Sequence, residues 1–374
     1  MSSSVAVIGG SIAGLYAAER LARRGHTVRV YDGADGLDPT CRSLIVTGAL
    51  RDLLGDWAED AIVNEIDRFE LVANDKRVEV ELGSPDLIIE RATLIRRLAA
   101  AAEASGAEIA WGHRLERMKA HGNGIDMRFR NNGTEPTMAG SVIGADGAFS
   151  NVARAAGWRP QRLVSLVQAL VRLPSDLPPK TVRVWFVPQD TPYFYWLIPE
   201  SETTGALGVI GAESSVTRAL IDQFAAQQNL DVLGYQGAKI PEYAGWTSLH
   251  RRMGHGDVYL TGDAAGHVKV TTVGGVVDGL WGARAVADAI ASGRRRCTAS
   301  SLRAELGMHW LIRVVLNRFG DADYRALLEN VAGTSSGSLA RYSRDEATKL
   351  MWDLIRRRPR FVFLAARALF AQRT

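Results

Sequence analysis

The first 32 residues contain the feature that most constrains this chain: a short apolar strand, a glycine-rich turn, a helix and a second strand. The strand is VAVI at 5–8, the turn is GGSIAG at 9–14, and TVRVY at 27–31 leads to Asp32. A dinucleotide-binding βαβ unit places such a turn and the helix N-terminus against the pyrophosphate, and an acidic residue about twenty positions later binds the ribose. Serine takes the middle position of the G-x-G-x-x-G pattern, where its hydroxyl can donate a hydrogen bond. The pattern predicts that a dinucleotide is held by Gly9, Gly10, Ser11, Ala13, Gly14 and Asp32.

Composition excludes several other classes of protein. Apolar residues make up 47% and charged residues 23% of the 374 residues, which excludes a disordered or fibrous chain. The net charge of +4 is small for this length, so no nucleic-acid partner is predicted. Two cysteines, Cys41 and Cys297, are too few for a disulfide framework or a cysteine-based zinc site, and no metal is predicted. Without a signal sequence or an apolar run of about 18 residues, the chain is expected to be cytoplasmic.

Two further glycine-rich turns follow apolar strands. The first is IGADGAFSNVAR at 143–154, and the second is LTGDAAGHVKVTTVGG at 260–275. A carboxylate and free backbone N–H groups beside a helix N-terminus suit a polar ligand chain. A lone copy would be weak evidence for a bound dinucleotide, and three such turns in this order are much stronger evidence.

Hydrophobic patterning divides the chain into three parts. The βαβ rhythm of the N-terminus gives way to antiparallel alternation between about 163 and 213 and then returns at 257. We predict a discontinuous dinucleotide-binding domain (1–67, 91–160 and 250–295), an inserted antiparallel sheet domain that binds substrate (68–90 and 161–249), and a helical C-terminal region (296–374). The fold class is therefore α/β with a Rossmann-like domain.

The three turns, in this order, resemble the FAD-binding motifs of the flavoprotein hydroxylase superfamily, whose fold is that of para-hydroxybenzoate hydroxylase. The resemblance spans Val5 to about Ile290. It implies FAD as the cofactor, with the inserted sheet lying over the flavin. Carried over to this sequence, the middle and late motifs imply that FAD is also bound by Asp146, Gly147, Gly262, Asp263, Gly274 and Gly275. Arg91, which opens a helix after a strand, matches a basic residue that these proteins place near the flavin.

Within that superfamily, the chain is most similar to the geranylgeranyl reductase branch. The segment 262–283 resembles its late motif, FYWLIP at 194–199 resembles its Y-x-W-x-F-P strand, and Cys41 falls where the branch has a cysteine facing the flavin. Cys41 and the next residue, Arg42, are therefore also predicted to contact the cofactor. Arg42 stands in place of the glycine usual after that cysteine, and Val270 in place of a proline. The resemblance implies reduction of a carbon–carbon double bond in a hydrophobic, isoprenoid substrate by hydride transfer from reduced flavin.

Three alternatives use the same fold. A monooxygenase would hydroxylate or epoxidise a small hydrophobic or aromatic substrate. A flavin halogenase has a W-x-W-x-I-P motif that FYWLIP nearly matches, and a prenyl-binding escort would bind substrate without catalysis. Escorts tend to lose the middle and late flavin motifs, both of which are present here.

Double-bond reduction needs a proton donor opposite the hydride. The candidates are Cys41, Tyr195 and His267, with Tyr193 as a fourth, and the aromatic residues Trp185, Phe194 and Trp196 are candidates for the wall of a substrate cavity. Only one dinucleotide turn is present, so NADPH or NADH is expected to bind transiently, unless a partner protein supplies the electrons. Residues 356–373 (RRRPRFVFLAARALFAQR) are basic and amphipathic; such a helix either docks on the protein's own core or rests on the inner face of a membrane.

Overall fold

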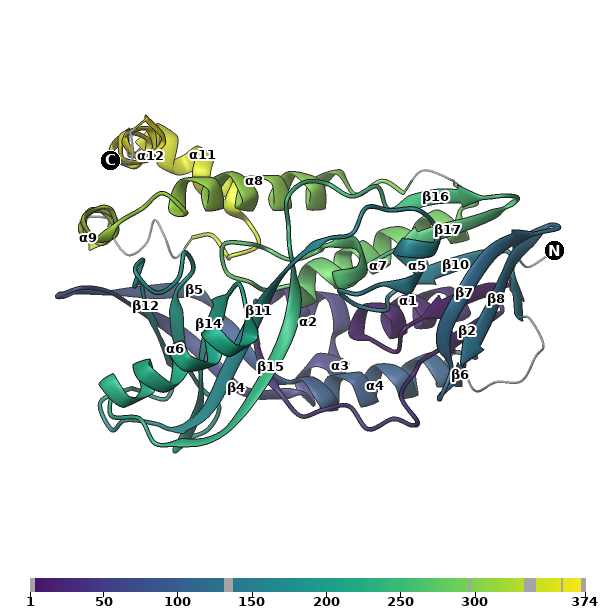
Figure 1. Cartoon of the computed structure of the whole chain (residues 1–374), viewed down its shortest axis with the longest axis horizontal. Coiled ribbons are helices and arrows are strands. Elements are labelled where there is room, and N and C mark those ends of the chain that lie inside the picture. Colours follow the sequence, from purple (N-terminus) through teal and green to yellow (C-terminus); the bar gives the residue numbers. More distant parts are fainter. Residues whose placement is uncertain (1–3, 131–136, 295–296, 333–340, 358, 371–374) are drawn as a thin grey trace.

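The structure is a computed structural model that describes residues 4–130, 137–294, 297–332, 341–357 and 359–370. Two sheets lie side by side along the long axis, and a layer of C-terminal helices crosses above them (Figure 1). No helix of the described part is long and apolar enough to cross a membrane. Among the same residues, no cluster of three or more histidine, cysteine or acidic side chains is arranged to hold a metal ion.

The first sheet has six strands in the order β16-β17-β10-β1-β2-β6, and all its pairs are parallel except β16 with β17. Its strands are β1 (Val5–Ile8), β2 (Val28–Tyr31), β6 (Glu108–Ala110), β10 (Ser141–Gly144), β16 (His250–Met253) and β17 (Gly256–Leu260). One face packs on α1 (Ile12–Ala22), α4 (Arg91–Ala104) and α7 (Val276–Ala291). The other face is covered by β7 (Arg114–His121), β8 (Gly124–Arg130), β9 (Thr137–Ala139) and α5 (Asn151–Ala155). Burial on both faces explains why β1 is apolar throughout and why every residue of β10 is buried.

The second sheet has eight strands in the order β15-β11-β14-β13-β12-β4-β5-β3. Its strands are β3 (Ser43–Val46), β4 (Ile62–Ala73), β5 (Lys76–Glu90), β11 (Arg162–Arg172), β12 (Thr181–Trp185), β13 (Tyr195–Pro199), β14 (Thr204–Gly211) and β15 (Val232–Glu242). Every pair is antiparallel except β12 with β4. Helix α6 (Ser214–Gln227) covers one face, so only the other face is available to a ligand.

The remaining elements join and cover these sheets. They are α2 (Ala49–Leu54), α3 (Asp56–Glu59), the 3-10 turn η1 (Gly262–Ala265), α8 (Ser300–Leu316), α9 (Asp321–Ala332), α11 (Ala347–Arg357) and α12 (Pro359–Phe370). Helix α9 packs on β4 and β5, which attaches the C-terminal helices to the second sheet.

The predicted fold class is confirmed: a parallel sheet with helices, a second and largely antiparallel sheet, and a helical C-terminal region. Strand pairing differs from the predicted boundaries at one place. Residues 43–46 and 62–67, assigned to the dinucleotide-binding part, lie in β3 and β4 of the second sheet. The pairing of Ser43 with Glu90 is a long-range contact, and the hydrophobic period of a single segment carries no information about its partner.

Candidate functional site

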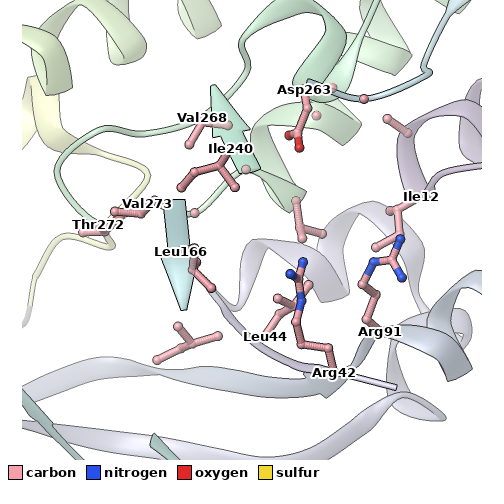
Figure 2. A pocket seen from close by; sticks show the side chains of 18 of the residues that line it. Ile12, Arg42, Leu44, Arg91, Leu166, Ile240, Asp263, Val268, Thr272 and Val273 are labelled. Carbon is pink, nitrogen blue, oxygen red and sulfur yellow. The ribbon is translucent and has the colours of Figure 1, made fainter. Parts of the chain in front are cut away.

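A cavity of about 1170 Å³ lies between the two sheets. Its walls combine the glycine turns of the first sheet, several arginines that include Arg42 and Arg91, and the uncovered apolar face of the second sheet. Figure 2 shows Arg42 and Arg91 pointing into it from one side and Leu166 and Ile240 from another, with Asp263 above the arginines. This volume exceeds the roughly 300–1,000 Å³ of an ordinary small-molecule pocket, so the cavity has room for more than one ligand.

The first turn packs its backbone closely against the neighbouring strand. A Cβ on Gly14 would lie 2.2 Å from the carbonyl oxygen of Gly9, so helix α1 can approach β1 only without a side chain there. Asp32 accepts hydrogen bonds from the backbone N–H groups of Gly10 (2.6 Å) and Ala34 (2.8 Å). Ser11 accepts one from the N–H of Gly14 (3.2 Å) as the N-cap of α1. The serine that departs from the glycine pattern therefore caps the helix.

In the second turn, Asp146 orders its own loop. Its carboxylate accepts hydrogen bonds from the Ser150 hydroxyl (2.5 Å) and from the backbone N–H groups of Asn151 (2.7 Å) and Val152 (3.2 Å). These bonds hold the start of α5 and leave Gly147, with φ +77°, on the cavity wall. Asp146 thus positions backbone toward the cavity.

The third turn brings three elements together. Gly262, with φ +59°, would place a Cβ 3.2 Å from the Cβ of Ala13 on α1, and a Cβ on Gly279 of α7 would lie 3.3 Å from the Cα of Gly262. Gln161 donates hydrogen bonds to the carbonyl oxygens of Asp263 (2.8 Å) and Ala264 (2.9 Å), which fixes the turn from the side. The close packing places the N-termini of α1 and α7 at the same end of the cavity.

The segment that leads into α7 is strained and uncapped. Val273 has φ +56°, a conformation that is an outlier for a β-branched residue, and its side chain lines the cavity beside Thr272 (Figure 2). Gly275 is the N-cap of α7 and has no side chain with which to cap the first turn of the helix. Backbone N–H groups therefore face the cavity without a side-chain cap, which suits an electron-rich ligand atom.

Arg42 and Arg91 give this end of the cavity its positive charge. Both are mostly buried, and burial lowers the pKa of each; their mutual repulsion lowers that of Arg42 further. Asp263 faces them, and its own pKa is raised by burial while the two arginine charges oppose that rise. The Nε atom of Arg42 is buried and has no hydrogen-bond partner in the described part of the chain. Asp263, Glu90 and Asp32 all act on Arg91, so the unpaired Nε of Arg42 is the group left to bind an anionic ligand.

These residues fit a dinucleotide such as FAD. Glycine backbones allow close approach, and the helix N-termini and the unpaired Nε of Arg42 suit phosphate oxygens. Asp32 lies at the end of β2, where a dinucleotide-binding fold places the ribose. The cavity lining includes most of the predicted cofactor residues, namely Gly9, Gly10, Ser11, Ala13, Asp32, Arg42, Arg91, Asp146, Gly147, Gly262, Asp263, Gly274 and Gly275. Gly14 lies behind them, where it allows the close packing described above.

The opposite wall is apolar and comes from alternate residues of the second sheet. Val182 and Val184 of β12, Ile198 of β13 and Leu166 of β11 all face the cavity. Phe194 and Trp196, both predicted, are part of this wall, and their rings lie 5.8 Å apart in an edge-to-face arrangement. This wall suits a hydrophobic substrate.

Trp185 was predicted to line the substrate cavity and Tyr195 to donate a proton there, but both side chains lie on the other face of the sheet, under α6. Trp185 packs edge-to-face on Phe224 of α6, and Tyr195 stacks on the same ring at 3.9 Å. The Tyr195 hydroxyl donates to Asp190 (2.8 Å). Both side chains belong to the core beneath α6, because successive residues of a strand point to opposite faces.

His267 and Cys41 also lie outside the cavity lining. His267 is fully buried between Gly282 of α7 and the Trp246 ring, and burial lowers its pKa to about 3. Cys41 is exposed, whereas the next residue, Arg42, faces the cavity. Of the four candidate proton donors, the structure brings only Tyr193 to the wall.

Gln168 and Arg313 are among the polar residues of the cavity that sequence reasoning missed. Arg313 is buried and donates to the carbonyl oxygens of Val270 (2.9 Å), Pro192 (2.7 Å) and Thr271 (3.1 Å), which ties α8 to the loops around the cavity. Each is the one polar residue within an apolar run, LVQALV at 166–171 and LIRVVL at 311–316. A polar residue within an apolar run was the sequence signal that could have identified each of them, since a buried polar side chain needs a partner or a ligand.

Comparison with known proteins agrees with this geometry. Residues 2–293 match the model of the FAD binding domain family. A digeranylgeranylglycerophospholipid reductase of Methanothermobacter thermautotrophicus is 27% identical over 284 residues, which are 68% of this chain and 71% of that protein. A geranylgeranyl bacteriochlorophyll reductase-like protein from Thermoplasma acidophilum has the same fold, with a TM-score of 0.78 and 17% identity over 98% of this chain and 99% of that one.

The fold is shared more widely. The structure of p-nitrophenol 4-monooxygenase from Pseudomonas putida, 17% identical over the full length of both chains, superposes with a TM-score of 0.65. A family model that matches residues 2–293 of 374 covers most of the chain, including all three glycine turns. The chain belongs to the FAD-binding domain family and is a flavoprotein with the para-hydroxybenzoate hydroxylase fold.

Proposed function

We propose that this protein is an FAD-dependent reductase that saturates a carbon–carbon double bond in a hydrophobic, isoprenoid substrate. The observation that carries the proposal is that one wall of the cavity between the sheets fits the dinucleotide and the other wall is apolar. The similarity to a digeranylgeranylglycerophospholipid reductase supports the same substrate class. Bound FAD would supply the hydride for the reduction.

Tyr193 is the residue we assign as the proton donor. Its hydroxyl donates to Glu242 (3.1 Å), and its ring lies 4.6 Å from the guanidinium of Arg313. Burial and the Glu242 charge raise the pKa of Tyr193, so the phenol stays protonated across the physiological range. When the substrate carbon takes the phenol proton, Arg313 stabilises the phenolate, and Glu242, which is partly exposed, can return a proton from solvent. One hydride and this proton together account for the two hydrogens added to the double bond.

The electrons for reduction of the flavin come, in this proposal, from NADPH or NADH bound transiently, or from a partner protein. The three glycine turns line one end of the same cavity and are matched to FAD. Comparing the rate of flavin reduction by NADPH, NADH and dithionite distinguishes a nicotinamide donor from a protein donor.

The deciding experiment measures product formation by the purified, FAD-loaded protein with a prenyl substrate and reductant, both under air and without oxygen. A reductase forms a product two hydrogen atoms heavier under both conditions. Strict dependence on oxygen and gain of an oxygen atom would instead identify a monooxygenase. A protein that carries no flavin absorption bands but binds the prenyl chain would be an escort.

We also propose that substrate reaches the cavity from a membrane surface on which the C-terminal helices rest. Trp352 and Ile355 of α11 and Phe363 of α12 are 59%, 44% and 74% exposed, and these two helices pack against each other. Arg356 and Arg360 beside them are exposed as well. Apolar side chains among arginines suit an anionic lipid surface. Arg358 and Arg373 of the predicted basic segment lie outside the described residues.

A further inference from the structure

Two buried polar side chains on the apolar wall of the cavity each have an atom without a hydrogen-bond partner. Gln168 on β11 and Trp196 on β13 are 4% and 7% exposed, and both line the cavity. The Oε1 atom of Gln168 and the Nε1 atom of Trp196 are buried and make no hydrogen bond within the described part of the chain. Most buried polar atoms in proteins are paired, so two orphans on one wall require an explanation.

Strand register brings these two side chains into one row. Gln168 and Trp196 are each paired with Gly208 of β14, from opposite sides. Directly opposed residues of an antiparallel sheet point to the same face. A Cβ on Gly208 would lie only 2.5 Å from Nε1 of Trp196, so the indole lies across β14, toward β11. The glycine thereby allows the indole N–H and the Gln168 amide to occupy the same part of the wall.

Three charged side chains of the cavity lie away from this row. Arg42, Arg91 and Asp263 are on the opposite side of the cavity from Leu166, which lies two residues before Gln168 on β11 and on the same face (Figure 2). The row around Gly208 offers one neutral donor and one neutral acceptor. A hydroxyl group is complementary to this pair because it accepts one hydrogen bond and donates another.

We propose that Gln168 and Trp196 bind a hydroxyl oxygen of the substrate, with the indole N–H donating to it and the hydroxyl donating to the Gln168 amide oxygen. The inference rests on the proposed function, since it takes this cavity as the substrate site. It narrows the substrate class to an apolar chain that carries an uncharged alcohol. The two residues determine specificity by leaving polar atoms unpaired when the alcohol is missing.

Binding without turnover tests the proposal. The full-length protein is loaded with oxidised FAD and given no reductant, and its affinity is measured for geranylgeraniol and for the hydrocarbon of the same carbon skeleton that lacks the oxygen. The quantity compared is the ratio of the two dissociation constants, in which the general hydrophobic contribution of the cavity cancels between variants. Gln168→Met and Trp196→Phe are each expected to lower the preference for the alcohol by about tenfold.

Gln236→Met is the matched control. Gln236 is paired with Gln168 in the same row, on β15, is only half-buried and is not part of the cavity lining, so this substitution should leave the ratio unchanged. Equal ratios in the wild type and in both test variants would overturn the proposal. Either variant alone can test the proposal. If the thermal unfolding curve shows that one variant is misfolded, the other is used. The two proposals can fail separately. If the protein does not reduce the double bond but the two test variants still lose preference for the alcohol, the proposed function is overturned and the hydroxyl site is retained.

Discussion

The two walls of the cavity are built by different means. On the first sheet, the ligand-facing groups are backbone atoms at the carboxyl ends of β1, β10 and β17, which are neighbours in the sheet. On the second sheet, they are side chains of alternate residues along strands joined by long-range pairing. A backbone site requires glycine wherever a Cβ would collide. A side-chain site tolerates substitution, so the substrate wall can change while the cofactor wall stays the same.

The largest effect should come from adding a side chain to the backbone wall. Gly9 has φ +108°, and a Cβ there would lie 2.3 Å from the carbonyl oxygen of Ala145. Gly9→Ala should therefore weaken FAD binding at least about a hundredfold, because β1 and β10 must separate at the turn. Flavin content and thermal unfolding are the measurements. Gly36→Ala is the control, since nothing lies within 4 Å of its added Cβ; equal losses in both variants would contradict the prediction.

The next effect tests the chemistry of the side-chain wall. Tyr193→Phe should lower the rate of double-bond reduction by about a hundredfold or more, which is the usual contribution of a positioned proton donor. FAD affinity should not change, because Tyr193 contacts Glu242 and Arg313 and not the glycine turns. Tyr195→Phe is matched to it, since Tyr195 lies on the α6 face of the same sheet. If Tyr193→Phe retains full turnover, another donor supplies the proton.

A smaller effect should come from removing the charge of Arg42, which faces the cavity. Arg42→Gly should weaken FAD binding by about tenfold to a hundredfold and make it less sensitive to salt, because one charge-assisted contact to the phosphates is lost. Arg42→Lys should retain most of the salt dependence. Titration of apoprotein with FAD at two ionic strengths provides the measurement, and unchanged affinity in Arg42→Gly would show that its buried guanidinium serves another ligand.

The smallest effect concerns the helices outside both walls. Replacing Trp352 and Phe363 with serine should reduce binding to vesicles that contain anionic lipid by roughly fivefold to tenfold, since two exposed apolar anchors are removed. Val216→Ser on α6, where an exposed valine lies far from α11 and α12, is the control (Figure 1). Equal binding of the wild type to anionic and neutral vesicles would contradict the electrostatic part of the prediction.

The cofactor wall was predictable from the sequence because its information is local. Gly9 to Gly14, Asp146 with Gly147, and Gly262 with Asp263 each lie within one short turn, and the same residues line the cavity in the structure or pack directly behind it. The role of Asp146 was not predictable in detail. Its carboxylate is engaged by Ser150 and by the backbone of α5.

For the substrate wall, the sequence predicted the type of structure but not which residues face the ligand. The alternating apolar strands indicated a sheet with one ligand-facing side, but not which side. Trp185 and Tyr195 were placed on the cavity side, and α6 covers them instead. Assigning faces requires knowing where α6 packs, and a helix from a distant segment decides that.

The sequence by itself therefore determined the chemistry of the cofactor: glycines, helix starts and Asp32 are sufficient for a dinucleotide because a tight turn is specified by adjacent residues. Only the tertiary structure decided what faces the substrate. Gln168 and Trp196, each with a buried polar atom that has no hydrogen-bond partner, lie in one row because both are paired with Gly208. The hydroxyl of Tyr193 donates a hydrogen bond to Glu242, which is 49 residues away along the chain. The physical reason is register, since one residue of slip in a strand moves every side chain to the opposite face.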